Sequence, residues 1–459
     1  MAGAPEAGVE GEKPQAARIA QAVLRLVSQH GAAASALGVR LGAAGLAYLL
    51  QIVLARSLGA ADYGTFSFSW SLVTIGGFIA TLGFGQIGVR FLAQYHQQGQ
   101  HGLAQGFLRA GIMASLGGSL AMAMLLFAAS PLVERGYGEL CTHVLAIGLI
   151  ALPFFALTDF MEGVARSQGW TIRALVPPYI IRQGAIIVIL LFALAIGTRI
   201  NAEIAMLAAL VATLVAALVQ VLLIAGKLRT TLPLAPPAYA FRDWMTAARP
   251  TLLSDLALLA RQNIDLIVLG LMAPASAVGL YFAATRIASL LGLIDFAVGA
   301  AFGHRFARAV NTDGTTPEAP ALRTLYAEAR RLTLGPGLLA ALMLILAAPL
   351  IMMLFGPAFA EAVVPTQILL AAGALLLAIC PAEDALGMAG HPDVVWRANA
   401  IGALVMAILC LLLTRDMQAV GAALSAAGGI VAANLMLVLG LRRYLGLSLF
   451  GLPAAREAA

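Results

Sequence analysis

The strongest chemical signal in this chain comes from charged residues that lie inside long apolar runs. Arg40 and Arg286 each lie in such a run with no obvious partner on the same helix, whereas Arg261 and Asp265 are four residues apart and share a helical face. A charge at the centre of a bilayer costs about 2.5–3.5 kcal/mol on insertion scales, so each one is a candidate functional residue. Arginine binds phosphate through two parallel hydrogen bonds. Arginines facing a water-filled cavity would therefore suit an anionic substrate.

For other charged residues a structural explanation competes with a functional one. Arg182 lies eight residues from one end of its run, so its side chain could extend to the membrane surface. Arg261 and Asp265 could simply neutralise each other. The same choice stays open for five acidic residues within the runs or near their ends. They are Asp159, Glu162 (four residues before Arg166, as in a structural ion pair), Asp295, Glu383 and Asp384, the last two being expected to face cytoplasmic water.

The composition is that of an integral membrane protein. Of the 459 residues, 61% are hydrophobic and only 11% are charged, and the mean hydropathy is +0.92. A soluble domain carries about 25% charged residues. The apolar runs predict an all-α protein with twelve membrane-spanning helices, since a helix of roughly 20 apolar residues crosses a bilayer. The expected spans are 35–57, 64–84, 107–129, 142–165, 174–197, 203–225, 250–271, 278–302, 332–355, 362–387, 394–413 and 419–441.

The distribution of basic residues predicts how these spans are oriented. If both termini are cytoplasmic, 20 of the 28 Lys and Arg residues fall on the inside, four fall in outside loops and four lie within spans. Cytoplasmic loops carry such an excess of basic residues. The net charge of +6 therefore has a topological explanation, and nucleic acid is not expected as a partner.

The chain contains an internal repeat. A shift of 215 positions carries Gly64 onto Gly279, Gly77 onto Gly292 and the pair Arg90-Phe91 onto Arg305-Phe306. We therefore expect two parallel six-helix lobes with the substrate route between them. The predicted segments are an N-terminal tail (1–33, either an interfacial helix or unstructured), a first lobe (34–225), a cytoplasmic linker (226–249), a second lobe (250–441) and a C-terminal tail (442–459).

A short turn joins the first two spans, from Arg56 to Phe66. We expect Gly59 and Gly64 to serve the tight reversal there. Together with the segment from Leu82 to Gly85 and the closing pair Arg90-Phe91, this stretch resembles the polysaccharide-biosynthesis flippases of the O-antigen type. That family belongs to the superfamily that also holds the lipid II flippase and the multidrug and toxin exporters.

The resemblance implies a V-shaped pair of lobes around a central cavity that opens alternately to each side of the bacterial inner membrane. The substrate would be an undecaprenyl-pyrophosphate-linked oligosaccharide. In relatives, cationic residues of spans 1, 2 and 8 line the cavity; Arg40 and Arg286 occupy comparable positions, whereas span 2 has no basic residue here. Candidate substrate-binding residues are Arg40, Gln51 (on the helical face of Arg40), Arg261 and Arg286. Asp255 and Asp265 are candidates for coupling to H⁺ or Na⁺.

Two other classes of function are alternatives to a flippase. The first is a cation-coupled multidrug exporter, which favours acidic and aromatic cavity residues. The second is a membrane glycan polymerase or ligase, which usually needs a large outer loop; the expected outer loops have no more than about a dozen residues. No enzymatic activity, cofactor or metal is expected. We expect a monomer with membrane lipid around it and contact with the glycan assembly machinery.

Overall fold

The computed structural model describes residues 15–132, 139–233, 235–310 and 319–446. Within these ranges the chain is helical and contains no strand. The helices of the first half are α1 (Gln15–Ala80), α2 (Phe84–Gln97), α3 (His101–Ala128), α5 (Glu139–Ser167), α6 (Thr171–Val176), the π-helix η1 (Pro177–Ile181), α7 (Arg182–Ala195) and α8 (Ala202–Thr231). Those of the second half are α9 (Phe241–Met272), α10 (Ala275–Ala288), η2 (Ser289–Leu291), α11 (Gly292–Val310), α12 (Ala319–Phe355), η3 (Pro357–Ala362), α13 (Val363–Ile379), α14 (Ala382–Met388) and α15 (Pro392–Leu445).

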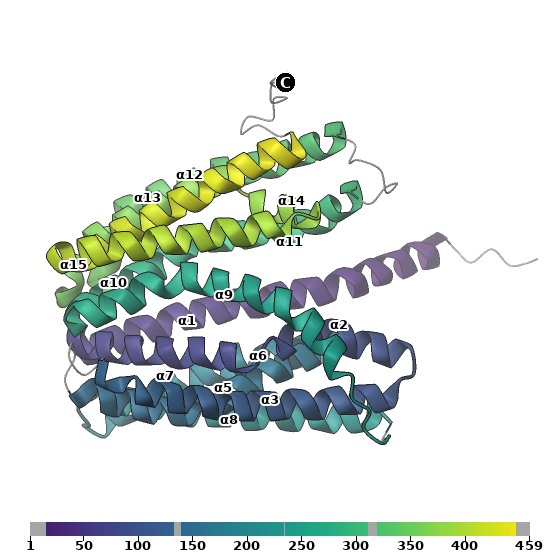
Figure 1. The fold of residues 1–459 in the computed structure, drawn as a ribbon, viewed down its shortest axis with the longest axis horizontal. Helices are drawn as coiled ribbons and strands as arrows, with labels where there is room; N and C mark the ends of the chain where they lie inside the picture. The colour runs from purple at the N-terminus through teal and green to yellow at the C-terminus, as the bar shows by residue number, and fades with distance from the viewer. Residues whose placement is uncertain (1–14, 133–138, 234, 311–318, 447–459) are drawn as a thin grey trace, which may run out of the picture.

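Two of these helices fold back on themselves. α1 is interrupted at Gly59, which has φ 72° and ψ 177°, and α15 is interrupted at Gln418, which has φ 45° and ψ −122°. Figure 1 shows each of them as two long arms lying side by side. The expected role of Gly59 in the reversal is confirmed, because a positive φ is readily adopted by glycine.

Nine helical segments in the described part of the chain are long and apolar enough to cross a membrane. Two of them, Gly42–Gln97 and Pro392–Leu445, contain 56 and 54 residues, which is far more than one crossing requires. α9 is absent from the nine because charged residues recur along it. The predicted number of twelve spans therefore stays a prediction, whereas the all-helical membrane fold is confirmed.

The outer surface of the helices is apolar. On α12, Leu342, Leu346 and Leu350 follow one another at intervals of four residues and form an exposed stripe, with 66% of Leu346 and 67% of Leu350 accessible. Soluble monomers rarely expose contiguous apolar surface of this kind. This face of the helix is suited to contact with lipid chains.

The helices form two lobes, which Figure 1 shows one above the other with α9 and the first arm of α1 between them. α9 contacts both lobes. Near its start, Trp244 is buried in the first lobe and its Nε1 donates a hydrogen bond of 2.9 Å to the Tyr95 hydroxyl. Near its end, Leu269 is buried in a cluster with helices of the second lobe. The helix also contains Pro250, which removes one backbone hydrogen bond.

The lobes are joined most closely at the end of the molecule where α1 reverses, called here the Gly59 end. A Cβ atom on Gly64 would lie 1.8 Å from the Ala275 carbonyl oxygen, and one on Gly279 would lie 2.1 Å from the Ala60 carbonyl oxygen. α1 and α10 therefore cross with their backbones in contact. The structural reason for Gly64 is this close approach, so the expectation that it serves the reversal is replaced.

Further contacts between the lobes surround this crossing. Arg56 Nε donates a hydrogen bond of 2.7 Å to the Leu354 carbonyl oxygen, and the rings of Tyr63 and Phe359 meet edge to face at 5.6 Å. One buried apolar cluster spans both lobes here. Towards the opposite end the buried clusters are separate, one containing Phe107 and one containing Phe306. The lobes are thus packed together at the Gly59 end and diverge away from it.

Candidate functional site

A cavity of about 720 Å³ lies between the lobes. Its walls come from both arms of α1, from α7 and from α9, α10 and the segment that follows α10. Cavities of 300–1,000 Å³ are typical ligand sites. The polar residues that line it are Tyr48, Gln51, Ser71, Thr74, Arg182, Gln183, Gln262, Asn263, Thr285, Arg286 and Ser289.

Arg286 enters this interlobe cavity from α10. Its guanidinium carbon lies 4.3 Å from the centre of the Phe282 ring, an attractive cation–π distance. Its Nε atom is buried and has no hydrogen-bond partner. Nearby, the Tyr48 hydroxyl and the Ser289 Oγ are hydrogen-bonded at 3.0 Å. Arg286 is therefore held by an aromatic ring at the cavity wall, and its buried Nε has no hydrogen-bond partner within the described protein.

Arg182 enters the same cavity from the other lobe, at the start of α7. Its guanidinium carbon lies 4.9 Å from the centre of the Phe155 ring and 6.0 Å from that of Trp70. The alternative that this side chain merely reaches the membrane surface is not what the structure shows, since Arg182 lines the cavity. The sequence left its role open because a span position alone does not reveal which helix face points inward.

The charge balance of the cavity is one-sided. Among the described residues that line it, two are arginines and none is an aspartate or glutamate. Its other polar groups are amides and hydroxyls, which can donate as well as accept hydrogen bonds. Charges interact strongly where water is scarce. The cavity is therefore suited to an anion that also carries hydroxyl groups.

The four predicted substrate-binding residues occupy different places. Gln51 lines the interlobe cavity, and its Oε1 accepts a hydrogen bond of 2.8 Å from the Tyr63 hydroxyl. Arg286 lines the same cavity. Arg40 lies on α1, but its side chain is outside the described residues. Arg261 lies elsewhere, in a cavity of about 100 Å³ within the second lobe, and its Nη2 is 3.7 Å from Glu383 Oε1.

The predicted ion-coupling residues both lie on α9. Asp265 is buried; one carboxylate oxygen accepts from the Leu266 backbone N–H at 2.7 Å, and the other accepts a hydrogen bond from the Tyr281 hydroxyl. It does not pair with Arg261, whose ion-pair partner is Glu383. Asp255 differs from Asp265, because its Oδ2 is buried without a hydrogen-bond partner.

The other undecided acidic residues also have observed neighbours. Glu162 Oε1 lies 3.9 Å from Arg166 Nη1, as expected for an ion pair one helical turn apart. Asp295 accepts a hydrogen bond of 2.7 Å from the Cys380 thiol. Asp384 lines the smaller cavity with Glu383, so these two residues border a cavity within the lobe.

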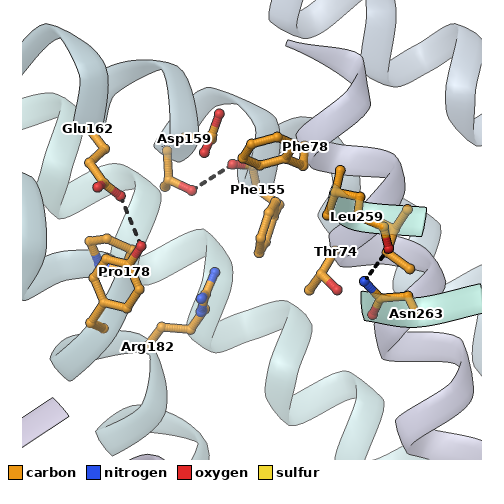
Figure 2. Close-up of a pocket in the computed structure, with 12 residues that line it drawn as sticks. Thr74, Phe78, Phe155, Asp159, Glu162, Pro178, Arg182, Leu259 and Asn263 are labelled. Atoms are coloured by element: carbon orange, nitrogen blue, oxygen red, sulfur yellow. Dashed lines mark hydrogen bonds between the residues drawn. The ribbon is translucent and has the colours of Figure 1, made fainter. Parts of the chain in front are cut away.

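A second cavity, of about 270 Å³, adjoins the interlobe cavity. Thr74, Arg182 and Asn263 line both cavities. Figure 2 shows the Phe155 ring among the side chains that line this second cavity, with Asp159 above it and Arg182 below it in this view. Neither the cavity nor the contribution of Asn263 to it was predicted from the sequence, because its walls combine α1, α5 and the η1–α7 segment with α9, which lies far along the chain.

Two lobes of membrane helices around a polar central cavity form the architecture of a membrane transporter. The family described as "Polysaccharide biosynthesis protein" matches residues 32–302. The match covers more than half of the chain, so the chain belongs to this family. It is a family of membrane flippases, and the resemblance noted in the sequence is confirmed. No curated protein sequence matches the chain significantly.

Solved structures share the fold. An inward-facing multidrug resistance MATE family transporter of the MOP superfamily superposes with a TM-score of 0.70 at 17% identity, over 86% of this chain and 94% of that one. The lipid II flippase MurJ in an inward closed conformation superposes with a TM-score of 0.69 at 14% identity, over 89% of this chain and 87% of that one. A MOP superfamily transporter from Pyrococcus furiosus, described as having a binding pocket of reversed polarity, superposes with a TM-score of 0.57 at 17% identity. The superposition covers 88% of this chain and 93% of that one.

Proposed function

We propose that this protein translocates an undecaprenyl-pyrophosphate-linked oligosaccharide across the bacterial inner membrane by alternating access. The observation that carries the proposal is the interlobe cavity, which presents Arg182 and Arg286 from opposite lobes and no carboxylate among its described lining residues. A pyrophosphate is a dianion or more highly charged group that such arginines bind well. Membership of the polysaccharide biosynthesis family supports the glycan.

In this mechanism Arg286 binds the pyrophosphate when the lobes diverge towards the cytoplasm. The Phe282 ring lies against its guanidinium group, which would donate to the phosphate oxygens from the cavity wall. The lobes, assigned to 34–225 and 250–441, would then separate at the Gly59 end. The isoprenoid chain would stay in the bilayer throughout, since the outer faces of the helices are apolar.

The test is translocation of a fluorescent pyrophosphate lipid by the full-length protein in liposomes. Arg286→Ala should lower the initial rate at least about tenfold, because a hydrogen bond to a charged group contributes about 1.5–3 kcal/mol. Arg286→Lys should be intermediate, since it keeps the charge without the paired geometry. Arg415→Ala is the control, because Arg415 is exposed. Transport of ethidium in place of the lipid would instead identify a multidrug exporter.

We also propose that Asp255 and Asp265 couple translocation to H⁺ or Na⁺. The unpaired, buried Oδ2 of Asp255 supports this role most directly, since a buried carboxylate without partners gains most from a bound cation or proton. A proton or sodium gradient should accelerate the wild type, and Asp255→Asn should abolish that acceleration while leaving slow equilibration. Asp243→Asn, an exposed carboxylate on the same helix, is the control. A wild type that ignores both gradients would refute coupling.

A further inference from the structure

The second cavity differs in chemistry from the interlobe cavity that it adjoins. Two carboxylates line it, Asp159 and Glu162, together with the aromatic rings of Phe78 and Phe155. Both carboxylates come from α5 and are three residues apart, so they lie on neighbouring parts of one helix face. The cavity is therefore rich in hydrogen-bond acceptors and bordered by ring faces.

Contacts among the side chains of the second cavity hold them in position. The Tyr179 hydroxyl donates a hydrogen bond of 3.2 Å to Glu162 Oε2, so tyrosine and glutamate hold each other in place at one wall. Arg182 lies at the boundary with the interlobe cavity, stacked on Phe155 at 4.9 Å. Figure 2 shows Glu162 and Arg182 on one side of the Phe155 ring and Asn263 on the other.

This combination is complementary to a sugar. Carboxyl oxygens accept hydrogen bonds, and sugar hydroxyls donate them. Aromatic rings offer a flat apolar surface to the C–H face of a pyranose ring, where weak C–H contacts add to area burial. Pyrophosphate oxygens, by contrast, also accept hydrogen bonds, so they are poorly matched to the oxygens of Asp159 and Glu162. The two adjoining cavities therefore suit two different parts of one molecule.

We propose that the second cavity is a sugar subsite, in which Asp159 and Glu162 accept hydrogen bonds from hydroxyls of the glycan and Phe155 stacks on a sugar ring. The inference rests on the proposed function, because it takes the pyrophosphate to lie beside Arg286 in the interlobe cavity. Arg182 lines both cavities, which places it where the phosphate joins the first sugar. Asp159 and Phe155 are thus residues that determine specificity for the glycan.

The experiment compares two probes on the detergent-solubilised full chain. One is lipid-linked glycan extracted from native membranes, and the other is undecaprenyl pyrophosphate without sugar. The wild type should bind the glycan-bearing lipid more tightly, by about tenfold or more for one hydrogen bond to a carboxylate. Asp159→Asn and Phe155→Leu should each remove most of this difference while leaving the affinity for the bare pyrophosphate lipid unchanged.

Two further variants separate this proposal from the proposed function. Arg286→Ala should weaken the binding of both probes by the same factor, whereas Phe192→Ala, on the exposed face of α7, should change neither. Unchanged binding of the bare lipid also shows that Asp159→Asn is folded. If both probes bind the wild type equally, or if the glycan preference survives in Asp159→Asn and Phe155→Leu, the sugar subsite is refuted. If the other variants behave as expected but Arg286→Ala binds both probes as tightly as the wild type, the pyrophosphate contact is refuted instead.

Discussion

Arg261 and Glu383 form an ion pair that joins α9 to α14 inside the second lobe. The arginine side chain is only 12% exposed, and the glutamate is 37% exposed. The aliphatic part of Arg261 also lies close to Gly402 of α15, where a Cβ atom would be 3.5 Å from Arg261 Cδ. A charge in this position is stabilised by its partner and by packing against a third helix. Its geometry supports a role in holding the lobe together.

Removal of either partner should destabilise the protein. Glu383→Gln leaves the mostly buried guanidinium without a counter-charge, and we expect a loss of about 1–3 kcal/mol in the free energy of unfolding. Arg261→Gln should cost a similar amount, and the double variant should cost clearly less than the sum of the two. Thermal unfolding in detergent measures all three.

The control for this comparison of the single and double variants is Arg397→Gln. Arg397 pairs with Asp393 at 3.6 Å, but both side chains are about half exposed, so the change should be nearly neutral. Strictly additive losses from Arg261 and Glu383 would contradict the ion pair. Unchanged transport in a stable Arg261 variant would support a structural role over substrate binding.

Sequence reasoning identified charged residues inside spans but could not tell which of them face the same space. Arg286 and Gln51 were expected at the cavity and line it. Arg182 also lines it, whereas Arg261 is directed to Glu383, a residue 122 positions away in the chain. Helical spacing relates residues on one helix only, so a partner on another helix is invisible to it.

At the level of helices, the crossing of α1 and α10 determines how closely the lobes meet. Because a Cβ atom on Gly64 would lie 1.8 Å from a backbone oxygen, even alanine there must push the helices apart. In the proposed alternating-access mechanism, this contact would form in one state and separate in the other. The two glycines therefore favour the state in which the Gly59 end is closed.

Gly64→Ala should shift the protein towards a conformation open at the Gly59 end. Spin labels at Arg199→Cys and Arg415→Cys, both exposed, would report the separation of the lobes by pulsed electron resonance, and we expect a new population at longer distance. Gly279→Ala should act in the same direction. Gly117→Ala, where a Cβ atom meets nothing within 4 Å, is the control. An unchanged distance distribution in both folded variants would contradict the role of the crossing.

The extent of the elements could be predicted better than their contacts. The expected break between 413 and 419 coincides with the interruption at Gln418, and that between 57 and 64 with Gly59, because apolar runs longer than the bilayer must turn. Gly64 was assigned to the turn, since sequence does not distinguish a glycine needed for a positive φ from one needed for a close helix crossing.

At the level of the whole molecule, the excess of basic residues predicts which side faces the cytoplasm. In intact cells, a membrane-impermeant thiol reagent should label Arg415→Cys at the Gly59 end and should not label Arg229→Cys at the opposite end until the membrane is opened. Both positions are exposed, so access is limited by the bilayer alone. The three native cysteines are buried, and the unsubstituted chain supplies the background. The reverse labelling pattern would overturn the orientation.

The contact between Gly64 and Gly279 has a consequence for the symmetry of the cavity, because these residues correspond in the 215-residue repeat. In a twofold-symmetric dimer, a residue on the axis meets its own copy. In a symmetric pair of identical subunits packed in this way, the position of Arg286 would carry the same residue in both copies. The corresponding position in the first half is now Ser71, which lines the same cavity. Within a single chain the two halves can differ at this position, so one lobe places an arginine and the other a serine at equivalent points of the cavity wall, an asymmetry that no homodimer could have.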